Sequence, residues 1–480
     1  MPRQKRKQLG IYEEGVPMRL QKRGLVVLLC LLLAAVALFS AACGTKSETT
    51  TTSGGAPGGG STTSSSSAGG GQEQPVLKVG ALLSLDSIQG VEMKKWLELF
   101  AKLYNDNGGW KIGDATYKVQ PMVYDVGVWD AAKTRSAVEK AVLQDKVQYL
   151  VCNWGDIPAE TISVTEPNKV LWLGLDFTDD TVKPTLQYAI RAQGLFFAQG
   201  LFYYICQDYM AQGAKSVLVV CPDTQQGHVG AELVAATART AGMEVLSPVF
   251  FSADTTDFSP IATKIASQKP DAVFFSYVAG ASLINAIGAL KDTGWKGLIL
   301  PGELDGETLN NLVARVGKEY VEGMETGSYD PRTVEKDPQT VKYIETYQQL
   351  YGDWHSEGCF WVGPWFIFED AVNATQSTDV DALVAYLKDS KKGVKTLTGY
   401  SQLFARPDLQ NFKTVDSAPG HYIGVVRDGK FEYLETIACK DQYLSSIKVY
   451  GLKDVYQKYW DEYGYPQFPD QPSRFDFSDL

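Results

Sequence analysis

The stretch Ser216–Ala241 constrains the fold more than any other part of this sequence. It begins with the apolar, β-branched run Val217–Val220, continues through a loop containing Pro222 and Gly227, and ends in a helix with one apolar face. Such a run is typical of a buried parallel strand, and strand, loop and helix make half of a βαβ crossover. Similar units recur along the chain. We therefore predict an α/β fold with a ligand site at the carboxyl ends of parallel strands.

The beginning of the chain indicates export. Basic residues precede the apolar run Leu25–Ala42, whose last residues are small, and Cys43 follows. This layout is typical of a signal peptide, which we assign to residues 1–42, with 1–17 as a misassigned start if translation begins at Met18. The junction resembles a bacterial lipoprotein signal, which implies a lipid on Cys43. The alternative is an uncleaved membrane-spanning helix, because about 18 apolar residues come close to the required length.

Composition defines the next two segments. Residues 43–75 are almost only Gly, Ser, Thr and a few polar residues, which predicts a flexible linker. The remaining body is long enough for two or three domains. A net charge of −11 argues against a nucleic-acid partner. The cysteines of the body lack metal-binding spacings, and we expect most of them to be small core residues; they are Cys152, Cys206, Cys221, Cys359 and Cys439.

The body contains two series of strand–helix units followed by a largely helical region. In the second series, Ser259 followed by Pro260 predicts a helix start with Ser259 as its cap. Further along, Cys359–Thr375 is expected to form one helix. Asp428-Gly429 between two apolar runs is a strong signal for a β-hairpin.

Several stretches, in this order and spacing, resemble one known family. They are LKVGALLSL, FAKLYNDNGG, DAAKTRSAVEKAV, YAIRAQGLFFAQGLFYYI, GAKSVLVVCPDTQQGHVGAEL, TDFSPIATKIASQKPDAVFFSY and LILPGELDGETL. Together they resemble the leucine/isoleucine/valine-binding family of ABC-transporter substrate-binding proteins, which has the type I periplasmic-binding fold. The resemblance covers Val76 to Thr436.

This resemblance implies two similar, doubly wound α/β lobes joined by three hinge crossings. The crossings would lie near Arg191–Gly194, Tyr320–Gly323 and Ala418–His421. The first lobe would then comprise residues 76–192 and 323–417, and the second 193–322 and 418–440. Residues 441–480 form a C-terminal extension for which we have no role.

The resemblance also implies a ligand site between the lobes. Asn153-Trp154-Gly155-Asp156 stands where amino-acid binders have a Ser-rich loop, with Trp154 as a flat wall. Glu303 matches a carboxylate that takes an ammonium group. The predicted ligand-binding residues are Asn153, Trp154, Asp156, Asp176 and Phe177 from the first lobe, and Gln225, Gln226, Tyr277 and Glu303 from the second.

Several of these residues have a simpler structural interpretation. Trp154 could cover the underside of its own loop, and Asp156 and Asp176 could be helix caps. Tyr277 could belong to the core, and Gln226 could be a solvated loop residue. Acidic and aromatic residues predominate among the predicted ligand-binding residues, and no Lys or Arg is close to them in sequence. We therefore expect a polar, neutral or cationic solute that is amino-acid-like, amide-like or aromatic.

The function that follows is capture of a small-molecule solute outside the cytoplasm, and its transfer to the permease and ATPase subunits of an ABC importer, without a cofactor. The alternative is a ligand-sensing subunit that reports to a separate membrane partner. An enzyme is disfavoured because the sequence contains no Gly-x-Ser-x-Gly, metal-spaced His pair, P-loop or Gly-x-Gly-x-x-Gly after a strand.

Overall fold

The computed structural model describes residues 74–176, 183, 185–194, 196–252, 254–302, 304–327, 329–352, 354–389, 391–409, 411–478 and 480, with the backbone alone for 225, 357 and 411–415. The predicted signal peptide, Cys43 and all but the last two residues of the linker lie outside this part of the chain. Within it, no helix combines the length and the apolar character needed to cross a membrane.

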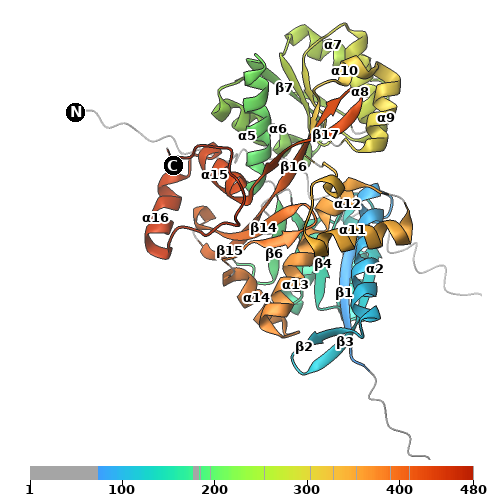
Figure 1. Cartoon of the computed structure of the whole chain (residues 1–480), viewed down its shortest axis with the longest axis vertical. Helices are drawn as coiled ribbons and strands as arrows, with labels where there is room; N and C mark the ends of the chain where they lie inside the picture. Colours follow the sequence, from blue (N-terminus) through green and yellow to red (C-terminus); the bar gives the residue numbers. More distant parts are fainter. Residues whose placement is uncertain are drawn as a thin grey trace, which may run out of the picture. The chain divides into compact units, whose positions relative to one another are not determined.

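The first lobe is built on a nine-stranded sheet. Its central strands are parallel, and β14 and β15 join it through a parallel pairing of β15 with β6. The orange β14 and β15 therefore lie beside the green β6, far away in sequence (Figure 1). In spatial order the strands are β13 (Val394–Thr396), β14 (Gly399–Arg406), β15 (Asn411–Pro419), β6 (Ala189–Gly194), β5 (Leu171–Asp176), β4 (Tyr149–Val151), β1 (Val76–Leu83), β3 (Ala115–Asp125) and β2 (Trp110–Ile112).

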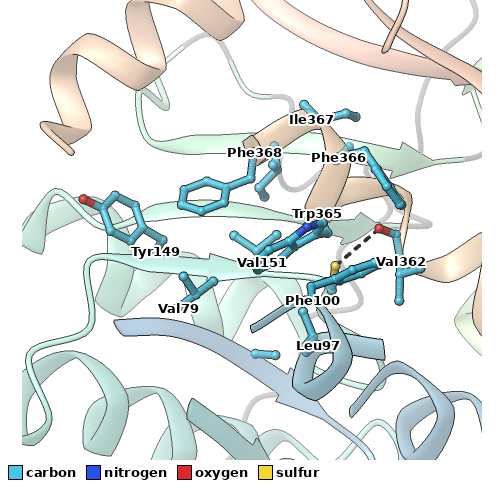
Figure 2. Close-up of a cluster of buried hydrophobic side chains, with 14 of the residues drawn as sticks. Val79, Leu97, Phe100, Tyr149, Val151, Val362, Trp365, Phe366, Ile367 and Phe368 are labelled. Carbon is cyan, nitrogen blue, oxygen red and sulfur yellow. Dashed lines mark hydrogen bonds between the residues drawn. The ribbon is translucent and has the colours of Figure 1, made fainter. Parts of the chain in front are cut away.

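Alternate side chains of these strands pack against helices on the two faces of the sheet. On β1, Leu77 and Val79 belong to one apolar cluster and Leu82 to another, as the period of two in a strand requires. Figure 2 shows the first cluster, where Trp365 and Phe368 of one covering helix lie over Val79 and Val151. This face is covered by α2 (Ile88–Asp106), α11 (Pro338–Tyr351), α12 (Ser356–Trp361), α13 (Gly363–Thr375) and α14 (Val380–Asp389), and the other by α3 (Ala131–Glu139), the π-helix η1 (Lys140–Gln144) and α4 (Pro158–Thr165).

The second lobe repeats this plan with a smaller parallel sheet. The order is β11–β10–β7–β8, with β9 also paired to β7. Its strands are β7 (Ser216–Pro222), β8 (Glu244–Val245), β9 (Val249–Phe251), β10 (Ala272–Phe275) and β11 (Leu298–Leu300). One face carries α5 (Gln199–Ala211) and α6 (Gln225–Ala241), and the other α7 (Ser259–Gln268), α8 (Gly280–Asp292), α9 (Gly306–Val316) and the short α10 (Lys318–Val321).

A three-stranded antiparallel sheet packs against the apolar clusters of the second lobe, with Val426 in one cluster and Ile423 and Ile437 in the other. It consists of β12 (Glu325–Thr326), β16 (His421–Arg427) and β17 (Lys430–Ile437). The predicted hairpin between β16 and β17 is confirmed. Asp428 and Gly429 both have positive φ, 47° and 77°, which is the requirement of the tightest two-residue hairpin turn.

The C-terminal extension includes two helices and contacts elements of both lobes. It contains α15 (Cys439–Val449) and α16 (Lys453–Tyr463). Helix α15 packs against α5 and α6 of the second lobe and against β14 and β15 of the first. Its Tyr443 is at the centre of a separate apolar cluster with Phe197 and Phe404.

Two local predictions are wrong. Ser259 is the first residue of α7 rather than its cap, and Asp257 Oδ1 accepts the Ser259 N–H at 2.9 Å. The helix expected over Cys359–Thr375 is divided into α12 and α13 at Val362, because Pro364 has no N–H to continue the first helix. The exact lobe boundaries stay a prediction. In the described structure the five body cysteines are buried thiols that form no disulfide with one another, as expected of core residues.

Candidate ligand-binding site

The carboxyl ends of strands from both lobes converge on one cavity. Leu175 near the end of β5 and Gln193 near the end of β6 contribute from the first lobe. From the second lobe, the residues directly after β10 and β11 contribute. Ligands of α/β proteins bind at this edge of the sheet because the loops that follow the strands meet there. The parallel arrangement of the strands thus positions the site.

The cavity is large and mainly apolar. It contains about 1130 Å³ of space between atoms, part of which is open to solvent. Because part of this space is open to solvent, it sets an upper bound on the ligand, which is that of a small molecule. Its apolar walls come from α5, α6, β10, β11 and α12; they include Leu201, Phe202, Ile205, Leu233, Val234, Phe274, Phe275, Leu300, Phe360 and Trp361.

Tyr277 is a predicted site residue that lines this cavity. Its backbone is in the left-handed region, with φ of 57°, directly after β10. The ring lies against α6 at Gly230, where a Cβ atom would come within 2.5 Å of Tyr277 Cε2 and 2.8 Å of Ser276 Oγ. Gly230 is therefore required for the close approach of the Tyr277 ring to the helix.

Few polar groups interrupt the apolar wall. Gln193 is buried, and its Nε2 donates to the Phe360 carbonyl at 2.6 Å, which fixes the orientation of the amide. Among the described lining residues, Ser276, Tyr277 and His421 also have polar side chains, and the Trp361 indole has one N–H group. Among the described residues that line the cavity, none carries a charged side chain. The wall is therefore suited to an apolar or aromatic body with a small number of neutral polar groups.

His421 is the first residue of β16 and follows directly after the crossing segment that leaves β15. Its Nδ1 lies 3.3 Å from the Gly327 carbonyl oxygen, and its ring packs against Phe360 with centroids 4.4 Å apart. Burial lowers the pKa of His421 to about 4. The imidazole is therefore neutral at pH 7.

Two predicted residues of the first lobe are bonded within that lobe. Asn153 Oδ1 accepts the Leu82 N–H at 2.9 Å, so the side chain connects the loop after β4 to β1. Asp156 Oδ2 accepts from Thr161 Oγ1 at 2.8 Å and from Trp172 Nε1 at 3.3 Å. Burial raises the pKa of Asp156 to about 7. Neither residue is among those that line the cavity.

Trp154 packs against a residue of the cavity wall and is not itself among the lining residues. Its ring centroid is 4.6 Å from that of Trp361, and Trp361 does line the cavity. Its backbone joins the loop to the end of β1 through Ser84 N and Leu82 O, each at 2.8 Å. Asp176 is the last residue of β5 and is buried. Direct ligand contact by either residue stays a prediction.

The other predicted residues are placed only in part. Gln226 is half-buried in the first turn of α6, where Thr224 Oγ1 caps the helix by accepting the Gly227 N–H at 3.1 Å. The side chain of Gln225 is not described. Phe177 and Glu303 lie outside the described residues, although Glu303 directly follows Gly302, which lines the cavity.

Several cavity residues were not predicted from the sequence. Phe360 and Trp361 come from α12, and Gly327, Pro419 and His421 come from segments that run between the lobes. The sequence signal for Pro419 and His421 was the predicted crossing Ala418–His421, because segments that join two lobes necessarily border the cleft between them. In the described part of the chain, no group of His, Cys, Asp and Glu side chains is arranged to hold a metal ion.

Comparison with known proteins agrees with this architecture. Residues 77–415 match the model of the periplasmic binding protein family. A Leu/Ile/Val-binding protein homolog from Brucella melitensis is 25% identical over 288 residues, which cover 58% of this chain and 70% of the relative.

Solved structures share the fold, among them two with a bound ligand. A branched-chain amino acid binding protein from Streptococcus pneumoniae in complex with isoleucine has a TM-score of 0.59 at 18% identity, over 75% of this chain and 99% of its own. A solute-binding protein from R. palustris in complex with benzoate has a TM-score of 0.59 at 16% identity, over 75% and 96%. With two α/β lobes, a cavity walled by both, and a family match over most of the body, this chain belongs to the periplasmic binding protein family of solute-binding proteins.

Proposed function

We propose that this protein is the lipid-anchored, extracytoplasmic binding component of an ABC importer, and that it captures a small aromatic or branched apolar solute. The observation that carries this proposal is the cavity whose wall combines Phe360 and Trp361 of the first lobe with Phe202, Phe274 and Tyr277 of the second. A ligand that contacts both lobes stabilises the arrangement in which they enclose it.

The chemistry of the wall narrows the class of solute. Aromatic rings and aliphatic side chains stabilise a ligand by burial of apolar surface, at about 25 cal/mol per Å². A ligand charge buried against this wall would lack an oppositely charged partner among the described lining residues, which costs free energy. We therefore favour a neutral ring or branched chain with one or two polar substituents.

Calorimetric titration of the purified protein tests this. We expect p-cresol, indole or a related neutral aromatic compound to bind with a negative heat-capacity change, which is the sign of apolar burial. The series should also include L-isoleucine and benzoate, which the two structural relatives bind. If none of these compounds binds, the proposed solute class is wrong.

Glu303, which the resemblance assigns to an ammonium group of the ligand, provides the alternative. If the solute carries an ammonium group, Glu303→Gln should weaken its binding by about 2–5 kcal/mol, as removal of one partner of a desolvated charge pair does. L-isoleucine is the probe. Affinity for isoleucine that is the same in both proteins would remove Glu303 from the site.

The lipid anchor has a separate test. In cells fed radiolabelled palmitate, wild-type protein should be labelled and should sediment with membranes, whereas Cys43→Ser should be unlabelled. Cys30→Ser, within the apolar run Leu25–Ala42, is the matched control and should behave as wild type. Labelling of the Cys43→Ser protein would contradict lipidation at Cys43.

A further inference from the structure

His421 contains a buried hydrogen-bond acceptor beside the cavity. The residue is 6% exposed, lines the cavity, and packs on Phe360. Its two ring nitrogens have different surroundings. Nδ1 faces the Gly327 carbonyl oxygen, whereas no donor among the described residues lies within hydrogen-bonding distance of Nε2.

The contact with Gly327 determines the tautomer. A carbonyl oxygen only accepts hydrogen bonds, so Nδ1 must carry the proton of this 3.3 Å contact. Burial keeps the ring neutral by lowering the pKa of His421 to about 4. A neutral ring with the proton on Nδ1 presents a lone pair at Nε2, and Nε2 is therefore an acceptor.

An acceptor in such a place is expensive to leave without a partner. A buried acceptor without a partner has lost the hydrogen bond that water gives it in the unfolded chain. In a site with little water, a hydrogen bond from a ligand to this acceptor is also stronger than it would be in water. Because His421 lines the cavity, a bound ligand is the partner that can supply the missing donor.

We propose that His421 is a specificity-determining residue whose Nε2 accepts a hydrogen bond from a hydroxyl or N–H group of an otherwise apolar, aromatic ligand. This inference rests on the proposed function, because it assumes that a small molecule occupies the cavity. It adds the chemical class of that ligand, a neutral aromatic alcohol, phenol or N–H heterocycle.

The same geometry disfavours other ligands. A carboxylate has acceptors alone and would place its lone pairs against that of Nε2. An ammonium group can donate to Nε2, but its charge would be buried against a wall without charged side chains among the described residues. An ether or an O-heterocycle fits the apolar wall but leaves Nε2 without a donor.

Matched ligand pairs test the donor requirement. We expect p-cresol to bind at least about tenfold more tightly than 4-methylanisole, and indole more tightly than benzofuran, because one buried hydrogen bond is at stake. His421→Phe should remove both preferences. Phe202→Leu, which trims the wall elsewhere, is the control and should weaken both members of a pair while the preference remains.

Nitrogen NMR of the wild-type protein covers the case in which His421→Phe does not fold. The chain has three histidines, so untagged protein with ¹⁵N-histidine gives few ring signals. The ligand-free protein should show a non-protonated Nε2 for His421, and p-cresol should shift that signal upfield. A proton on Nε2, or equal affinities within both ligand pairs, would overturn the inference.

The two proposals fail in different ways. If ligands bind without regard to their donors, the role of His421 is wrong and solute capture stands. If no compound of the whole series binds, including isoleucine and benzoate, the proposed solute class fails and the inference about His421 fails with it.

Discussion

Arg191 on β6 and Asp416 on β15 form a buried ion pair, in which Arg191 Nε donates to Asp416 Oδ1 at 3.0 Å. Asp416 also accepts from Arg406 Nη1 at 2.9 Å, and Asp408 is a second acidic partner of Arg406 at 2.8 Å, so the two arginines share Asp416. Because β6 and β15 lead out of the first lobe toward the crossings, this pair stabilises the point at which the chain leaves the lobe.

Replacing Asp416 with Asn should destabilise the protein strongly. Arg191 and Arg406 would then lose the buried carboxylate that they share, and breaking a buried ion pair typically costs about 3–5 kcal/mol. Urea denaturation followed by tryptophan fluorescence measures the loss. Asp292→Asn is the control, because its pair with Arg315 is exposed and screened by solvent, and its unfolding midpoint should hardly move. Equal effects of the two substitutions would contradict the role of Asp416.

Gly230→Ala should lower both stability and ligand affinity. Alanine is favoured over glycine in a helix by about 1 kcal/mol, but here its Cβ would lie 2.5 Å from the Tyr277 ring, and overpacking costs about 1–3 kcal/mol. Displacement of the ring should also alter the cavity. The control is Gly306→Ala in α9, where no atom lies within 4 Å of the added Cβ. A more stable Gly230→Ala protein with unchanged affinity would rule out this packing constraint.

Asp156 should make stability decrease as the pH rises. Its pKa is about 7 in the folded protein and 3.8 as the ordinary value, so between these limits the folded state holds the proton that the unfolded state has released. Stability is therefore lost as the pH increases toward and through 7. From pH 5 to pH 8, the free energy of unfolding of Asp156→Asn should increase by about 3 kcal/mol relative to that of the wild-type protein.

A second aspartate provides the comparison for that pH series. The Ser259 backbone N–H keeps the pKa of Asp257 below its usual value, so this carboxyl is ionised in both states from pH 5 to pH 8. The melting temperature of Asp257→Asn should therefore change with pH in the same way as that of the wild-type protein. If the melting temperature of Asp156→Asn also follows that of the wild-type protein, the Asp156 carboxyl is ionised from pH 5 to pH 8.

Tyr443→Ala should show that the C-terminal extension is part of the folded body. Tyr443 is 1% exposed, its ring centroid is 4.3 Å from that of Phe404, and its hydroxyl accepts from Trp460 Nε1 at 3.1 Å. Loss of a buried aromatic ring typically costs about 3–5 kcal/mol. Tyr463→Ala, whose side chain is 50% exposed, is the matched control and should leave the melting temperature nearly unchanged. The prediction fails if the melting temperature of Tyr443→Ala equals that of the control.

Local signals predicted the repeated units of the fold well. The β7–α6 unit and the Asp428-Gly429 hairpin depend on residues close in sequence, and both were found where the pattern placed them. Strands β14 and β15 were missed. The pairing of Asp416 with Arg191 joins segments far apart in the chain, and no local periodicity reports such a contact.

The site was predicted less completely than the fold. Tyr277 lines the cavity, because it follows a buried parallel strand and such positions border the ligand edge. Asn153 and Asp156 follow a strand in the same way, yet their polar groups bond to β1 and to α4 and β5. Sequence position identifies a loop near the site, but it does not tell which side chains turn back to stabilise that loop.

Helix α15 has a consequence for how far the protein can open. Leu201 N of α5 donates to Gln442 Oε1 at 3.2 Å, while Tyr443 packs on Phe404 of β14. Any rotation of one lobe against the other must carry α15 with one partner and break its contacts with the other. The amplitude of domain motion is thus restricted by residues beyond the 77–415 family match, and relatives that lack such a segment would be free of this restraint.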